Sequence, residues 1–81
     1  MSRWQKALER LRDPQRDTGW DFEDLCGLLQ RLGFEMRVHG SHHFFRRSGA
    51  EGVINLQPKN GQAKPYQVRQ ARAVLEQQGL P

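Results

Sequence analysis

The stretch Val38-His-Gly-Ser-His-His-Phe-Phe-Arg-Arg47 decides the fold, because it sets a tight turn between two segments of strand-like sequence. Glycine and serine are frequent turn residues, so Gly40-Ser41 is expected to reverse the chain. Before the turn, residues 34–38 alternate apolar and polar side chains with a period of two, which predicts a half-buried strand. Residues 42–47 then return as a second strand, so the sequence predicts a β-hairpin.

The same stretch carries side chains suited to phosphodiester chemistry. His42 and His43 follow the turn directly, and Arg46 and Arg47 come soon after them. Imidazole is the side chain best placed to move protons near neutral pH. The planar guanidinium group is well shaped to bind a phosphate. Both groups beside one turn favour a protein that handles RNA at a phosphodiester.

Length and charge limit the choice of fold and partner. The chain has 81 residues, which is enough for one domain and one core. Thirteen Lys and Arg against nine Asp and Glu leave a formal net charge of +4. A positive field attracts polyanions or an acidic protein, and the charge alone does not choose between them.

The single cysteine, Cys26, excludes an intramolecular disulfide and a metal site built from cysteines. A reducing compartment is the simplest setting for such a chain. No apolar run approaches the roughly 18 residues that suggest a membrane helix. The first residues, Met-Ser-Arg-Trp-Gln-Lys, lack the apolar centre of a signal peptide. We therefore expect a cytoplasmic protein without membrane contact.

Helices are predicted before and after the hairpin in the sequence. Apolar residues in the segment 2–12 recur at helical spacing, and Asp13-Pro14 ends that helix. A second helix, 22–32, has Asp21 as N-cap and Gly33 just beyond its end. After a third strand at 53–57, a last helix runs from Pro65 to about Gln78.

The resulting order is α-α-β-β-β-α, an α+β fold with a three-stranded antiparallel sheet and helices on one sheet face. A polar connector follows the first helix, so residues 1–19 are expected to form an N-terminal helix and linker. Residues 20–81 are expected to form the domain itself.

Three features together resemble the HicA family of bacterial toxins. They are the α-β-β-β-α order, the Gly-Ser-His-His-Phe-Phe turn at 40–45, and the tail in which Ile54-Asn-Leu-Gln-Pro58 precedes Lys64-Pro-Tyr-Gln-Val-Arg-Gln70. The resemblance covers about residues 20–79. It implies a fold like that of double-stranded-RNA-binding domains, used as a metal-independent endoribonuclease on mRNA. It also implies a HicB-type antitoxin that covers the active site.

The resemblance offers two positions for the essential histidine. In the family a histidine follows the Gly-Ser pair, which corresponds to His42, whereas some members have it one place later, which corresponds to His43. This chain has both, so the choice stays open. Many members also carry a histidine near Pro58, where this chain has Gln57 and Lys59.

The candidate site residues follow from these arguments. His42 and His43 are the candidate catalytic residues, acting as general acid or base. The candidate RNA-binding residues are Ser41, Arg46, Arg47, Lys59 and Lys64. His39 is a rival for a second proton-transfer role. No metal or small-molecule cofactor is expected, because adjacent histidines on one strand diverge and no cysteine or carboxylate is in register with them.

Phe44 and Phe45 pose a conflict that the sequence leaves open. Aromatic faces bind unpaired bases, but a small sheet also needs large apolar residues in its core. Alternation puts Phe44 on the face of His42 and Phe45 on the face of His43. We expect at least one phenylalanine in the core.

Two further functions compete with the nuclease. One is a non-catalytic RNA-binding module on the same fold, which would bind RNA in a salt-sensitive way without cutting it. The other is an adaptor that binds only an acidic protein.

Overall fold

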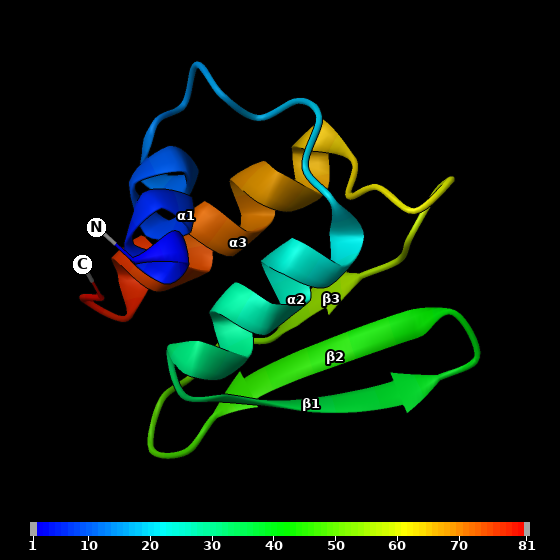
Figure 1. Cartoon of the computed structure of the whole chain (residues 1–81). Helices are drawn as coiled ribbons and strands as arrows, with labels where there is room; N and C mark the ends of the chain where they lie inside the picture. Colours follow the sequence, from blue (N-terminus) through cyan, green and yellow to red (C-terminus); the bar gives the residue numbers. More distant parts are fainter. Residues whose placement is uncertain (1, 81) are drawn as a thin grey trace.

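The computed structural model describes residues 2–80. The elements are α1 (Arg3–Arg12), α2 (Phe22–Arg31), β1 (Phe34–His39), β2 (His42–Arg47), β3 (Ile54–Leu56) and α3 (Pro65–Gln77). Figure 1 shows the helices stacked over one side of the sheet. The predicted α+β fold, an α-β-β-β-α core preceded by an N-terminal helix, is confirmed.

Local sequence explains where α2 begins and ends. The carboxylate of Asp21 accepts a hydrogen bond from the backbone N–H of Asp24 at 3.1 Å, as expected of an N-cap. Trp20, just before the cap, is buried, so it fixes the direction in which the chain enters the helix. Gly33 follows the helix with φ +100°, a conformation that favours glycine.

The sheet is a meander with strand order β1-β2-β3 and antiparallel pairing throughout. His39 pairs with His42, so Gly40-Ser41 is a two-residue hairpin turn. Gly40 has φ +60° while Ser41 does not have a positive φ, as in a type II′ turn. The turn residues therefore fix the register of the hairpin.

The register assigns each strand residue to one of two faces. One face packs against the helices and includes Phe45 and Ile54, which are completely buried. We call the other the open face, because the helices leave it uncovered. Its residues are Glu35, Arg37, His39, His42, Phe44, Arg46 and Asn55. Of the two phenylalanines of β2, Phe45 is core and Phe44 is only half-buried on the open face.

Helix α1 shares the core of the other elements. Leu11 is completely buried, and the Trp4 ring lies so close to Gly27 of α2 that a Cβ added to the glycine would be 2.6 Å from it. The connector after α1 is held as well. Arg72 of α3 donates two hydrogen bonds to the carboxylate of Asp17, at 2.7 and 3.1 Å, and a third to the carbonyl of Leu11 at 3.1 Å.

The segment between β3 and α3 is fixed onto the start of α2. Lys59 and Gln62 exchange two backbone hydrogen bonds, of 2.9 and 3.0 Å, around a bend at Asn60-Gly61. The backbone N–H of Phe22 donates to the carbonyl of Gly61 at 2.9 Å. As a result, this segment, the hairpin turn and the first residues of α2 and α3 lie at one end of the molecule (Figure 1).

Candidate functional site

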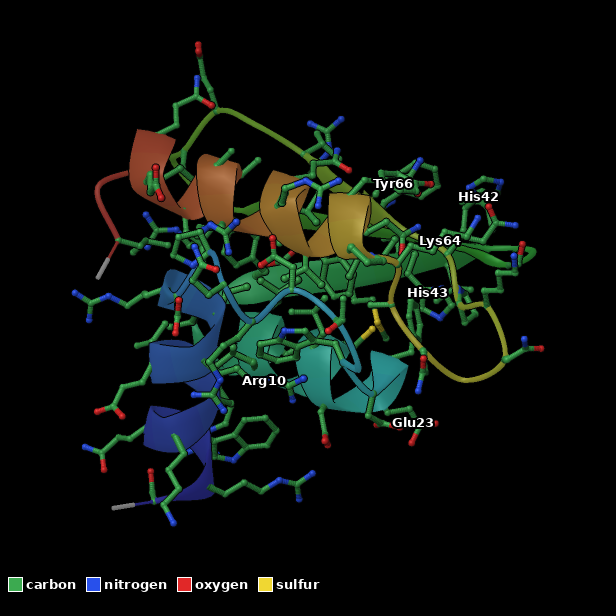
Figure 2. All side chains as sticks on the ribbon, turned by 90° about the horizontal axis from the view of Figure 1, so that it is seen from above. Arg10, Glu23, His42, His43, Lys64 and Tyr66 are labelled. Atoms are coloured by element: carbon green, nitrogen blue, oxygen red, sulfur yellow. The ribbon has the colours of Figure 1, made fainter. Side chains whose placement is uncertain are left out.

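The candidate residues gather at the end of the molecule that holds the hairpin turn. Figure 2 shows His42, His43, Lys64 and Tyr66 there, whereas Arg10 of α1 lies farther back. The turn is tied to the end of β3, because Gln57 Nε2 donates a hydrogen bond of 2.9 Å to Ser41 Oγ. Ser41 therefore helps to fix the turn from which both histidines follow.

His42 is exposed on the open face of the sheet. Its ring is stacked with that of Phe44, with centroids 6.2 Å apart and planes inclined by 24°. The ring of His39 also lies 6.2 Å from that of Phe44, in an edge-on orientation. Two imidazoles thus flank one aromatic ring on a surface that solvent can reach.

His43 occupies a different environment on the helix-facing side. It is half-buried, and its ring meets that of Phe22 edge-on at 4.8 Å. Its Nδ1 lies 3.1 Å from the carbonyl oxygen of Ser41. A carbonyl can only accept a hydrogen bond, so this contact requires the proton on Nδ1. The imidazole is thereby held against the turn.

A pocket of about 540 Å³ lies between His43 and α2. Its wall is largely apolar, with two carboxylates at its rim. It is lined by Asp21, Phe22, Glu23, Cys26, Gly27, Gln30, Met36, His43, Pro58 and Gly61. Asp21 and Glu23 would repel a phosphate, so this side of the hairpin is less suited to RNA than the open face.

The thiol of Cys26 is buried in the wall of this pocket. Burial, with the carboxylates of Glu23 and Asp21, raises the pKa of Cys26 to about 12. Because only the thiolate is nucleophilic, we expect alkylation of the folded protein at pH 8 to be slower by about 10³-fold than that of the urea-unfolded chain. Mass spectrometry of iodoacetamide-treated protein measures this ratio. Equal rates in the two states would contradict the described environment.

The arginines of the hairpin separate into two groups. Arg46 and Arg37 belong to the open face, where with Glu35 and Phe44 they line a hollow of about 340 Å³. Within residues 2–80, neither guanidinium makes a salt bridge. Arg47 instead faces the helices, and its Nε donates to Gln78 Oε1 at 3.1 Å. The structure therefore brings Arg46, but not Arg47, to the face of His42.

The two candidate lysines lie on the segment that joins β3 to α3. Lys59 is exposed beside the Asn60-Gly61 bend. Lys64 is the N-cap residue of α3, and its Nζ lies 5.8 Å above the ring centroid of Tyr66. Lys64 adds positive charge at the same end of the molecule as His42 and His43 (Figure 2), and the segment that carries Lys59 lies at that end too (Figure 1).

Among residues 2–80, no three His, Cys, Asp or Glu side chains are grouped so that they could hold a metal ion. The same residues contain no helix that is long and apolar enough to cross a membrane.

Comparison with known proteins places the chain in a family. The family model described as the HicA toxin of bacterial toxin–antitoxin systems matches residues 22–80. That match includes the hairpin, both candidate histidines and all of α3. No curated protein and no solved structure matches the chain significantly. The chain belongs to the HicA family, the toxins of bacterial toxin–antitoxin pairs, and the family implies an antitoxin as its partner.

Proposed function

We propose that this toxin is a cytoplasmic endoribonuclease that cleaves mRNA without a metal ion, and that His42 transfers protons in the reaction. A HicB-type antitoxin is its proposed inhibitor, binding over the same site. The observation that carries the proposal is the position of His42. It is exposed beside the turn, on the face that also holds Arg37 and Arg46.

The surroundings of the two adjacent histidines favour His42 over His43. RNA brings a negatively charged phosphate, and the nearby arginines of the open face would attract it. His43 faces a pocket with carboxylates at its rim and is packed against Phe22. We assign His43 a positioning role, because its Nδ1–H holds the carbonyl of Ser41.

The proposed reaction is a transfer of the phosphodiester to the neighbouring ribose oxygen. A neutral imidazole takes the proton of the 2′-hydroxyl, and the 2′-oxygen attacks phosphorus. The bond from phosphorus to the 5′-oxygen breaks, and an imidazolium donates a proton to that oxygen. The products are a 2′,3′-cyclic phosphate and a 5′-hydroxyl. His39, which pairs with His42 across the hairpin, supplies the second imidazole that this scheme needs.

Incubation of the purified protein with end-labelled mRNA in EDTA tests the proposed function. We expect fragments ending in a 2′,3′-cyclic phosphate, and fewer of them when antitoxin is added. RNA that is bound but never cut would instead identify a non-catalytic RNA-binding module. If the protein neither binds nor cleaves RNA at low salt, both RNA functions are excluded, and binding to the antitoxin is the function that remains.

Two proton-transfer groups predict a characteristic pH dependence. The cleavage rate should follow a bell-shaped curve, because one imidazole must be neutral while the other is protonated. His39→Asn should remove one limb of the curve and lower the maximum rate by about 10²-fold. A complete bell for this variant would exclude His39 from the reaction.

A further inference from the structure

The open face of the sheet combines an aromatic ring, two guanidinium groups and a hollow. Phe44 lies directly opposite Arg37 of β1 on one side and Asn55 of β3 on the other. Arg46 comes two residues after Phe44 on β2 and therefore has the same orientation. Phe45 is completely buried in the core, whereas Phe44 is only half-buried and Arg37 and Arg46 are exposed.

The outward residues of β2 place three kinds of side chain in a row. Successive residues of the open face are about 6.6 Å apart along a strand, since each residue advances about 3.3 Å. A ligand that follows β2 would meet the imidazole of His42, then the ring of Phe44, then the guanidinium of Arg46. A proton-transfer group would thus be next to a stacking group and a phosphate-binding group.

We propose that the open face is a binding site for unpaired RNA, in which one base stacks on Phe44 while Arg37 and Arg46 bind the neighbouring phosphates. This inference rests on the proposed ribonuclease function, and it specifies the substrate as single-stranded. The hollow beside Phe44, about 340 Å³, is large enough for part of a nucleotide.

The positive charges of the open face would attract either RNA or an acidic protein segment. The ring of Phe44, on which a base can stack, is the feature that favours RNA. Arg37 and Arg46 have no carboxylate partner within residues 2–80, so their charges are available to phosphates. Stacking on Phe44 requires an exposed base face, which a duplex conceals. Single-stranded RNA should therefore bind more tightly than the same sequence in a duplex.

Binding should be measured with RNA that cannot be cut. A short fluorescent 2′-O-methyl RNA has no 2′-hydroxyl to attack the phosphate, so its affinity is independent of catalysis. We expect Phe44→Leu, which keeps an apolar side chain of similar size, to weaken binding by about tenfold. Met36→Leu, on the opposite face of the same hairpin, is the matched control and should bind like the wild type.

Variants that change the charge of the open face test the phosphate contacts, because removing a positive charge and removing a negative charge should have opposite effects on affinity. Arg37→Gln and Arg46→Gln should weaken binding and should each reduce the slope of log K against log salt by about 0.7. Glu35→Gln should strengthen binding, because it removes a negative charge from the wall of the same hollow. Unchanged affinity in all three variants would overturn the proposed site.

Other outcomes separate this inference from the proposed function. If RNA is cleaved but Phe44→Leu affects neither binding nor cleavage, the inference fails while the nuclease stands. Binding that depends on Phe44 in a protein that never cleaves RNA would support the site and refute the nuclease. Equal affinity for duplex and single strand would overturn the inference. So would loss of antitoxin binding in Phe44→Leu with RNA binding unchanged, because the face would then be a protein interface.

Discussion

Replacing His42 by asparagine should lower the rate of RNA cleavage by about 10²–10⁴-fold, whereas the same replacement at His43 should leave most of the activity. Asparagine cannot transfer a proton at neutral pH, so it removes the proposed function of His42. At position 43 it still offers an N–H donor near the place of Nδ1, so the contact with the Ser41 carbonyl can be kept. Single-turnover cleavage of end-labelled mRNA measures both rates.

The cleavage rates of the His42 and His43 variants can be compared only if both variants are folded. His42 is exposed, so His42→Asn should change the midpoint of urea unfolding little. His43→Ala provides a second comparison, because it removes the donor as well as the ring. We expect His43→Ala to be less active than His43→Asn. An inactive His43→Asn with an active His42→Asn would reverse the assignment of the two histidines.

Loss of the buried ion pair between Asp17 and Arg72 should have the largest effect on stability. Only 10–12% of either side chain is exposed, and the carboxylate receives two hydrogen bonds from the guanidinium. Removing one partner of a buried pair costs about 3–5 kcal/mol, because it leaves the other charge unpaired. Small domains have only about 5–15 kcal/mol in total, so Asp17→Ala should lose a large part of the stability of the domain. Urea unfolding followed by circular dichroism measures the loss.

The double variant Asp17→Val/Arg72→Met separates the loss of the ion pair from the cost of burying an unpaired charge. Apolar residues of similar volume carry no charge to be left unpaired, so the double variant should be more stable than either Asp17→Ala or Arg72→Ala. If the double variant is less stable than both single variants, the attraction between the two charges outweighs the cost of burying them.

The same pair should make stability depend on pH. Hydrogen bonding from Arg72, and the charges of Arg72 and Arg69, lower the pKa of Asp17 against the opposing effect of burial. A carboxyl whose pKa is lower in the folded protein stabilises it above the unfolded-state value of about 3.9. That contribution is lost as the pH falls through the folded pKa. The difference in unfolding free energy between wild type and Asp17→Asn should therefore be constant near neutrality and shrink below about pH 4.

The sequence contained enough information to place the two histidines on opposite faces. Strand alternation separates His42 from His43, and a two-residue turn pairs His39 with His42. The apolar residues of β1 then identify the helix-facing side, because Met36 pairs with Phe45. The same register assigns Phe45 to the core and Phe44 to the open face, and it places His39 on the face of His42.

Other contacts could not be predicted from local patterns. Asp17 and Arg72 lie 55 positions apart, and the connector that holds Asp17 has the composition of an ordinary polar loop. The position of Arg47 depends on Gln78, 31 positions away, where α3 ends. Such pairings follow from how the helices pack, and neither periodicity nor spacing reports that packing.

The two faces of β2 have a further consequence for how this toxin can change over generations. The sequence of the strand is His-His-Phe-Phe-Arg-Arg, so the outward residues and the inward residues both have the order His, Phe, Arg. A slip of one position, which normally exchanges the two faces of a strand, would here present the same three side-chain types to solvent. Insertions or deletions of a single codon near the turn would thus keep the same three side-chain types on the outward face of β2, even though different copies of each amino acid would provide them.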